Sequence, residues 1–513
     1  MDSSLGGVWQ DLGVLVGRMD ALAGARGLLE WDQLCMMPPQ AAAGRGEQLA
    51  ALAAVYHEIL VSGDLGRLLD CLEDALDSAE PEVHPVHRGA LRNLRRERDR
   101  AVKLPLKLVE ALERSRARGH QAWLAARKAD DFAPFQPALT ELVALAGEAA
   151  ACLVEPGGHP YDAMLGAFEP GARTADLGPL FERLAAELAP LLDALRGSGW
   201  PDASQGASWP MAESEQRAQF LEVVEAMGFD FSAGRLDSAV HPFTCGMDPG
   251  DVRITARYDE GDLLSGLGTV LHEAGHGLYE QGVPPALLGT GVGRLLSTAV
   301  HESQSRFWEN MIGRSRPFCG WVAGRLQARH PGRPWDPELL FQALNRVRPG
   351  LVRVDADEVT YNLHVLVRYR LELGLVEGSL AVADLPEAWD AAYEQYLGLR
   401  APSPLTGVLQ DVHWAEGLLG YFPTYTLGTL YAASLARAME QGVPDLWERV
   451  GQGDLGGVLG WLREHVHRYA ALFDGAEIFA QAAPGRDPVE DFMDHLWARH
   501  GATRGLLRPP RRS

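Results

Sequence analysis

The sequence predicts a mostly α-helical fold with one short region of β-strand. Apolar residues recur at spacings of three and four along roughly the first two hundred residues, which is the period of one face of a helix. This part is also rich in Ala, Leu, Arg and Glu and poor in β-branched residues, a composition that favours helices over strands. With 513 residues, 46% of them hydrophobic, the chain can bury a large core.

The first predicted helix begins near Val8 and continues through the segment LLEWDQLCMM. Its apolar face repeats at helical spacing and consists of Val8, Leu12, Leu15, Met19 and Leu22. Pro38 and Pro39 end this helix, because proline lacks the amide hydrogen that a helix interior needs. A second helix is therefore expected to follow them.

Three longer helical stretches are predicted next, over residues 48–69, 88–127 and 174–195. We expect Pro190 to kink the last of them. Residues 197–206 have the loosest composition of this part, which fits a junction between two lobes better than a linker between domains. Helix therefore dominates the N-terminal part of the chain.

The strand signal is confined to residues 241–260, which read HPFTCGMDPGDVRITARYDE. Pro, Gly and Asp mark turns, and Val252 and Ile254 alternate with polar residues as in a half-buried strand. We expect a small sheet here, either as a surface hairpin or as an edge to which an extended peptide adds by main-chain hydrogen bonds.

The segment that follows, GLGTVLHEAGHGLYEQ, contains His-Glu-x-x-His at His272, Glu273 and His276. On a helix the two histidines lie about 40° apart, one turn above the other, so both rings can reach one metal ion. A separate apolar stripe at helical spacing would bury this helix and consists of Leu264, Leu267, Leu271, Ala274 and Leu278. Glu273 stands where zinc peptidases carry the general base. The alternative is a buried histidine pair without a metal.

A catalytic zinc ion needs three protein ligands and one open position. The next helical segment, LLSTAVHESQSRFWENM, offers His301 and Glu302, and the chemistry alone does not choose between them. Glu280 is closer in sequence, but it follows His276 by a turn of the same helix and is expected to lie too far along the axis.

Charge and cysteine content exclude several classes of protein. Asp+Glu 69 against Lys+Arg 47 gives a formal net charge of -22, which argues against binding to nucleic acid or to an anionic membrane surface. The five cysteines are scattered without a CxxC pair, so free thiols in a reducing compartment are expected. The N-terminus has no basic region and no apolar run has the length of a membrane span, which makes the cytoplasm the default location.

Several segments together carry a family resemblance. Glu302 follows His276 by 26 positions, within HESQSR. The other segments, in chain order, are LLEWDQ, HPYDAMLGAFEPG, HPF, DVRIT, HEAGH, VRVDAD and GVLQDVHW. This set, spread over nearly the whole chain, resembles the carboxypeptidase Taq family of metallocarboxypeptidases.

The resemblance implies that Glu302 is the third metal ligand and Glu273 the general base. It also implies one helical peptidase domain over residues 1–513, with two lobes around a long substrate groove, and a homodimer. Residues 504–513 fall outside the motifs and are expected to form a flexible basic tail. Zn²⁺ is the expected cofactor, and Co²⁺ is a possible substitute because His/His/Glu sites accept several divalent ions.

Hydrolysis also needs donors aimed at the oxyanion of the tetrahedral intermediate. The late segment HWAEGLLGYFPTYTLG offers His413, Tyr421 and Tyr425. Related helical zinc peptidases use a histidine and a tyrosine in this role. Sequence does not choose between the tyrosines, and aromatic packing is the alternative for each of them.

A carboxypeptidase needs a cation that recognises the free carboxylate of its substrate, and arginine suits this task better than lysine. Arg353 in VRVDAD resembles the carboxylate-recognising arginine of the family, while Arg253 and His241 are candidates for closing the end of the groove. Ordinary ion pairs with neighbouring aspartates are the alternative for both arginines.

The sequence therefore predicts a zinc carboxypeptidase that releases single residues, with broad specificity, from peptides with a free C-terminal carboxylate. One alternative is an oligopeptidase that cuts inside short peptides, which analysis of the products would distinguish. Another is a helical scaffold that binds peptides and keeps a vestigial metal site, which a metal assay would distinguish.

Overall fold

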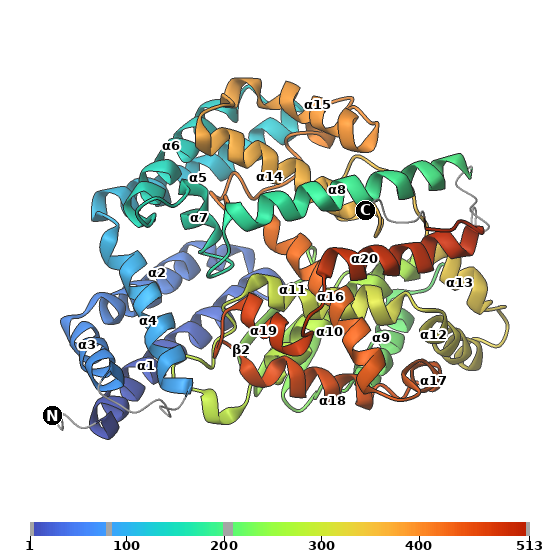
Figure 1. Cartoon of the computed structure of the whole chain (residues 1–513), viewed down its shortest axis with the longest axis horizontal. Coiled ribbons are helices and arrows are strands. Elements are labelled where there is room, and N and C mark those ends of the chain that lie inside the picture. Colours follow the sequence, from blue (N-terminus) through green and yellow to red (C-terminus); the bar gives the residue numbers. More distant parts are fainter. Residues whose placement is uncertain (1–4, 78–84, 199–208, 509–513) are drawn as a thin grey trace. The chain divides into compact units, whose positions relative to one another are not determined.

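The computed structural model describes residues 5–77, 85–198 and 209–508 (Figure 1). The chain divides into two compact units, each built from three stretches of sequence. The first unit comprises Met1–Val102, Gly206–Phe341 and Leu435–Gly485, and the second comprises Lys103–Gln205, Gln342–Ser434 and Arg486–Ser513. One unit boundary falls at the end of the predicted junction 197–206, most of which lies outside the described residues.

Helices make up most of both units. Those of the first unit are α1 (Leu5–Cys35), α2 (Ala42–Val61), α3 (Gly63–Asp77), α4 (Pro85–Lys103), α9 (Glu213–Met227), α10 (Leu263–Gln281), α11 (Thr298–Arg306), α12 (Arg316–Arg329), α17 (Leu446–Gln452), α18 (Gly456–His465) and α19 (Gly475–Ala482). Those of the second unit are α5 (Leu106–Ala129), α6 (Gln136–Leu153), α7 (Pro160–Leu165), α8 (Thr174–Gly197), α14 (Tyr361–Glu377), α15 (Leu385–Leu397) and α20 (Pro488–Leu496). α4 ends with one residue of the second unit, Lys103, and two further helices, α13 (Pro337–Leu344) and α16 (Phe422–Gly442), also include residues assigned to both units.

Two of the long helices predicted from sequence are wrong in their extent. The stretch 48–69 is broken at Ser62, whose hydroxyl accepts a hydrogen bond from the amide of Leu65 at 3.1 Å and so caps the start of α3. The stretch 88–127 is broken before Pro105, because proline disfavours the helical conformation of the residue that precedes it. The third helical stretch is confirmed as α8, which continues through Pro190 without a break, and the kink expected at Pro190 stays a prediction.

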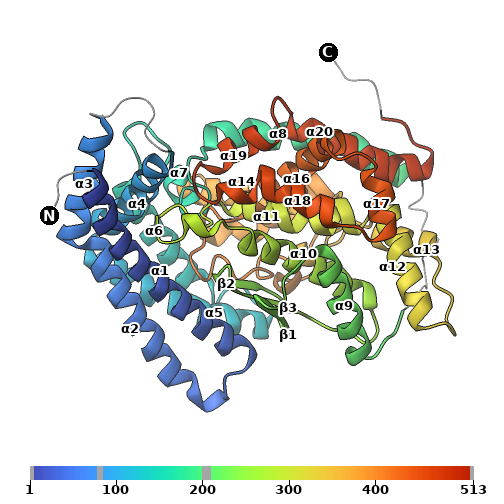
Figure 2. The ribbon, with the colours of Figure 1, turned by 90° about the horizontal axis from the view of Figure 1, so that it is seen from below.

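The predicted strands form a three-stranded sheet in the first unit. Its order is β1 (Gly234–Ser238), β3 (Asp251–Ala256) and β2 (Thr244–Asp248), with β1 parallel and β2 antiparallel to β3. Both Val252 and Ile254 are fully buried on the central strand. The sheet lies beside α10 (Figure 2), and the prediction of a mostly helical fold with one small sheet is confirmed.

The N-terminal helices of the first unit share one hydrophobic core. α1 and α2 run side by side (Figures 1 and 2), and the predicted apolar face of α1 packs against leucines of α3. Of its predicted members, Val8, Leu12 and Met19 are buried and Leu15 and Leu22 are partly buried, while Val16, which was not predicted, is buried beside them. Periodicity therefore identified the correct face of this helix.

The second unit buries one carboxylate among neutral donors. Both oxygens of Glu372 on α14 accept hydrogen bonds, from the Tyr161 hydroxyl at 2.5 Å, the Trp414 indole at 2.8 Å and the Gly420 amide at 3.0 Å. Burial raises the pKa of Glu372 to about 7, because desolvation penalises the ionised form more than these donors stabilise it.

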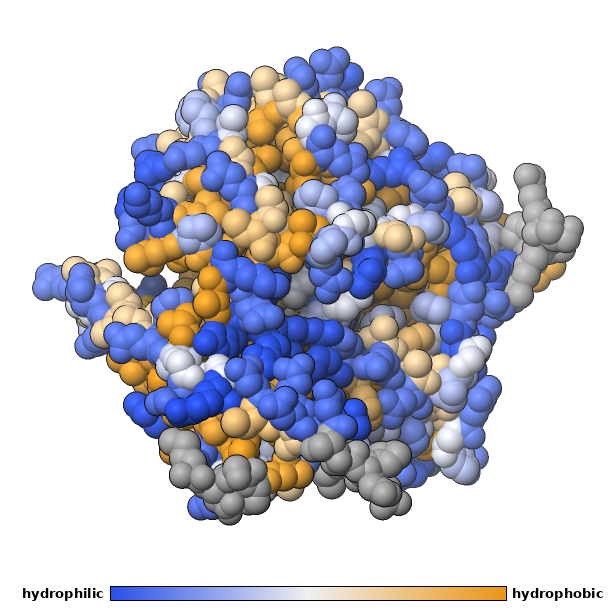
Figure 3. Space-filling view, turned by 60° about the vertical axis from the view of Figure 1, so that its left-hand side comes forward, coloured by the Kyte–Doolittle hydropathy of each residue, from blue (hydrophilic) through white to orange (hydrophobic). Residues whose placement is uncertain are grey.

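One face of the molecule is mixed in character. On the face drawn in Figure 3, hydrophilic and hydrophobic residues are interspersed. Among the described residues, no single helix is long and apolar enough to cross a membrane, and one bent pair, Pro39–Val61 with Gly63–Asp77, meets the length and composition criteria jointly. All five cysteines are free thiols, as predicted.

The start of the predicted basic tail has defined contacts. Arg504 donates a hydrogen bond to the carbonyl oxygen of His500 at 2.9 Å, and Arg508 forms ion pairs with Glu187 and Asp494. The last five residues lie outside the described part of the chain, so the flexibility of the segment 504–513 stays a prediction.

Candidate active site

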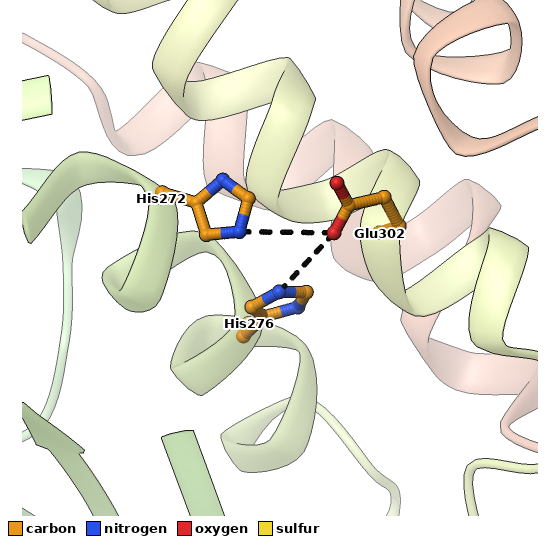
Figure 4. Close-up of side chains that lie close together, drawn as sticks. All are labelled: His272, His276 and Glu302. Carbon is orange, nitrogen blue, oxygen red and sulfur yellow. Dashed lines mark ion pairs between the residues drawn. The ribbon is translucent and has the colours of Figure 1, made fainter. Parts of the chain in front are cut away.

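His272, His276 and Glu302 come together in the first unit (Figure 4). The two histidines stand one turn apart on α10, and Glu302 reaches them from α11. Its Oε2 lies 3.7 Å from Nε2 of His272 and 3.5 Å from Nε2 of His276. Ligand atoms around a tetrahedral zinc ion with bonds of about 2.0–2.1 Å are separated by about 3.3–3.4 Å, so the distances from Glu302 to the two histidines are already close to that spacing.

Gly275, within the HEAGH segment, permits the approach of Glu302. A Cβ at this position would lie 2.6 Å from the carbonyl oxygen of Gln304 and 2.7 Å from Cα of Ser305, which are main-chain atoms of α11. Glycine therefore allows the two helices to touch at the level of the histidines. The sequence motif supplies the packing of its helix as well as the two imidazoles.

The protonation of the cluster suits a divalent cation. Burial lowers the pKa of His276 to about 3, so its ring is in the neutral form that binds metals. Burial alone would raise the pKa of Glu302, but Arg306 and His272 outweigh it and hold this pKa far below its usual range. Two imidazole nitrogens and one carboxylate form the donor set of many catalytic zinc sites. The residues present therefore fit a bound Zn²⁺.

The outer partners of the two histidines differ. Nδ1 of His272 lies 3.0 Å from the carboxylate of Glu309, which belongs to η3 (Phe307–Gly313), a π-helical segment that continues from α11. Glu309 also accepts from Arg306 and Arg314, and these cations lower its pKa to about 2 against the effect of burial. Although burial lowers the pKa of His272, Glu302 and Glu309 raise it overall.

Sequence reasoning missed Glu309. The only available signal was its spacing of seven residues from Glu302, which places two residues on nearly the same helical face. His301, the alternative third ligand, and Glu280 are outside the three-residue group. They instead form a chain of hydrogen bonds that begins at His276.

Glu273 is buried between His272 and His276 in the sequence of α10, and its carboxylate has one defined partner. The hydroxyl of Thr244 on β2 donates to Oε2 of Glu273 at 2.7 Å. Burial raises the pKa of Glu273 above its ordinary value. The sheet that the sequence predicted thus supplies a hydrogen bond to the predicted base, a role for Thr244 that the sequence did not reveal.

In the second unit, four other predicted residues form one cluster. Nε2 of His413 lies 3.3 Å from the hydroxyl of Tyr425, and the rings of Tyr421 and Tyr425 are 5.2 Å apart. The guanidinium of Arg353 lies 5.1 Å from the centre of the Tyr425 ring. Burial, with Arg353 nearby, lowers the pKa of His413 to about 4, so this imidazole is neutral at physiological pH.

Asp411 joins two arginines in this cluster. Its Oδ1 accepts from Nε and Nη2 of Arg353 at 3.0 and 2.8 Å, and its Oδ2 accepts from Nε of Arg368 at 2.6 Å. Nη1 of Arg353 donates to the Tyr361 hydroxyl at 3.3 Å. Despite burial, the two guanidiniums keep the pKa of Asp411 well below its usual range, and the three charges leave one net positive charge.

Arg253 and His241 lie in the first unit and have other surroundings. Arg253 bonds Asp251 through both Nε and Nη2 at 2.9 Å, and its guanidinium stacks 4.2 Å from the centre of the Trp31 ring. His241 is exposed in the turn before β2. Arg253 therefore forms the ion pair with a neighbouring aspartate that was the alternative to substrate binding.

The chain is similar to known carboxypeptidases over almost its full length. Residues 12–500 match the sequence profile described as Carboxypeptidase Taq (M32) metallopeptidase. Thermostable carboxypeptidase 1 of Thermus thermophilus is 39% identical over 94% of this chain and 96% of its own length. Thermostable carboxypeptidase 1 of Pyrococcus furiosus is 34% identical over 91% and 93%, respectively. The crystal structure of an M32 carboxypeptidase from Deinococcus radiodurans R1 superposes with a TM-score of 0.91 at 36% identity and covers 98% of this chain and 100% of its own.

Proposed function

Because this chain belongs to the carboxypeptidase Taq family of metallopeptidases, we propose that its metal is Zn²⁺, held by His272, His276 and Glu302. As a metallocarboxypeptidase, the protein hydrolyses the C-terminal peptide bond of peptides. The observation that carries the zinc proposal is the donor set itself, two imidazoles and one carboxylate with the buried Glu273 beside them.

A Zn²⁺ ion bound there lowers the pKa of a water molecule and polarises the scissile carbonyl. Glu273 accepts the proton of the attacking water and delivers it to the leaving amine. Burial raises the pKa of this carboxylate in the metal-free protein, which favours proton uptake relative to a solvated glutamate. Thr244 holds one carboxylate oxygen, which leaves the other oxygen for this transfer.

Arg353 is proposed to bind the terminal carboxylate of the substrate. Asp411 occupies part of its guanidinium, but the group formed with Arg368 keeps one net positive charge. In a buried environment such a charge favours an anion strongly. The Tyr361 hydroxyl, which accepts a hydrogen bond from Arg353, lies beside the same guanidinium and would be a neutral neighbour of the bound anion.

His413, Tyr421 and Tyr425 are proposed to serve the oxyanion. Of the two tyrosines, Tyr425 is the better candidate, because its hydroxyl already pairs with the neutral His413. Arg253 and His241 remain candidates for the end of the groove, and the ion pair of Arg253 with Asp251 would have to be shared with the substrate.

Four broader features are proposed from the family resemblance. These are a single peptidase domain over residues 1–513 with a long substrate groove, a homodimer, broad specificity, and activity with Co²⁺ in place of Zn²⁺. Light scattering of the purified protein tests the dimer, and metal replacement after chelation tests the cobalt form.

The direct test uses one short peptide in two forms, with a free C-terminus and with a C-terminal amide. The Zn²⁺-loaded protein should shorten the free form one residue at a time, as read by mass spectrometry, and should leave the amide nearly intact. Internal fragments would instead identify an oligopeptidase, and tight zinc binding without cleavage would identify a peptide-binding scaffold. Glu273→Gln, loaded with zinc, is the control, with turnover reduced about a hundredfold to ten-thousandfold.

A further inference from the structure

We propose that His301 and Glu280 form a hydrogen-bonded relay that fixes the tautomer and orientation of His276 and thereby sets the metal affinity of the site. The inference rests on the proposed ligand set and adds two residues that are not ligands. Nδ1 of His301 lies 2.6 Å from Nδ1 of His276, and Nε2 of His301 lies 3.0 Å from Oε1 of Glu280.

The protons of this chain have only one consistent arrangement when His276 binds a metal. Nε2 of His276 faces Glu302 and offers its lone pair to the ion, so Nδ1 of the same ring carries the hydrogen. Nδ1 of His301 must then accept, because two N–H groups cannot share one hydrogen bond. A neutral His301 that accepts at Nδ1 donates at Nε2, and the carboxylate of Glu280 is placed to receive that hydrogen.

The end of the relay is fixed by the packing around it. Gly246 on β2 lies against Glu280, and a Cβ at Gly246 would stand 2.6 Å from Oε2 and 2.8 Å from Cδ of that carboxylate. The His301 ring packs between its neighbours, 4.6 Å from the His276 ring and 5.3 Å from that of Tyr279. The sheet therefore packs against Glu280, and α10 packs against the ring of His301, so both residues of the relay are held in place.

The two histidine ligands thus receive different support. Nδ1 of His272 faces the carboxylate of Glu309 directly, whereas Nδ1 of His276 is linked to a carboxylate, that of Glu280, only through the imidazole of His301. Partners of this kind orient a ligand and raise its basicity, and their loss typically weakens metal binding about 10- to 100-fold. His301 is a positioning residue in this scheme, because it acts through His276.

The test measures the affinity of each metal-free variant for Zn²⁺ alone, by competition with a chromophoric chelator. His301→Ala should weaken binding about 10- to 100-fold. His301→Asn, whose Oδ1 replaces the accepting Nδ1, should stay within about threefold of the parent protein. Glu280→Ala should fall between them, and the double variant His301→Ala with Glu280→Ala should bind no more weakly than His301→Ala, because the relay is already broken.

His465→Ala is the matched control, since this histidine of α18 also stacks on an aromatic ring, that of Trp461, and bonds a carbonyl oxygen. Melting temperatures recorded with chelator present identify any variant that fails to fold. Parent-like affinity in folded His301→Ala, or losses in the double variant that multiply, would overturn the relay. Failure of the parent to bind one Zn²⁺, or unchanged binding in His272→Ala, would instead overturn the ligand set.

Discussion

Replacement of Arg353 should remove the preference of this carboxypeptidase for a free C-terminus. Arg353 is 6% exposed, and without its guanidinium Arg368 and Asp411 neutralise each other, so the cluster loses its one net positive charge. A hydrogen bond to a charged group contributes about 1.5–3 kcal/mol, so a contact of about 3 kcal/mol corresponds to roughly a hundredfold in kcat/KM. Arg353→Ala should therefore cleave the free peptide about a hundredfold more slowly.

The assay compares kcat/KM for free and amidated peptides with the parent protein and with Arg353→Ala. Both changes delete the same contact, so they should be non-additive, and the variant should treat the two peptides nearly alike. Arg370→Ala is the control, because this arginine lies on α14 close to Arg368 but pairs at the surface with Glu182. A folded Arg353→Ala protein that still prefers the free peptide about a hundredfold would refute the reasoning and make Arg253 the next candidate.

Three further predictions concern the base, the helix contact and pH. Thr244→Val should lower kcat about tenfold with little change in KM, because it removes one charge-assisted hydrogen bond to Glu273. Thr244→Ser keeps the hydroxyl and should retain the parent kcat. Equal losses of kcat in both variants would contradict a role for this hydrogen bond. Gly275→Ala should weaken zinc binding and cost about 1–3 kcal/mol of stability. Gly268→Ala on the same helix, where a Cβ meets nothing within 4 Å, should change neither property. Parent-like zinc affinity and melting temperature in both variants would refute the close contact between α10 and α11. Because burial raises the pKa of Glu372 from 4.5 to about 7, the folded state binds more protons than the unfolded state between these values, and stability falls as pH rises through this window. We therefore expect the free energy of unfolding, measured by denaturant titration, to fall over that pH window by about 3 kcal/mol more in the parent than in Glu372→Gln. Equal changes with pH in the two proteins would contradict the assignment.

The parts that sequence predicted are those encoded locally. The period of the apolar residues gave α1 and its buried face, and the single run of turn and strand signals gave β2 and β3. The His-Glu-x-x-His spacing placed two imidazoles one helical turn apart, as the structure has them. Helix ends were less predictable, because one serine or proline decided them at Ser62 and Pro105.

The parts that sequence missed depend on contacts between distant segments. Thr244 precedes Glu273 by 29 positions and meets it only because β2 lies beside α10. Asp411 meets Arg353 from 58 positions away. Glu280 was excluded as a ligand for its place on the helix, and the same place lets it end the chain that starts at His276. No periodicity or spacing reports such pairs, because each needs the folded chain to bring its members together.

In the role proposed for Arg353, Asp411 would also affect the rate of product release. Both products of exopeptidase cleavage, the released amino acid and the shortened peptide, carry a carboxylate, so a cation that captures substrate also retains product. Two uncompensated guanidiniums in a buried site would hold such an anion long after the bond is cut. By neutralising one of them, Asp411 leaves Arg353 and Arg368 with a single shared charge, so in the role proposed for Arg353 a product carboxylate should leave faster than it would from two uncompensated guanidiniums.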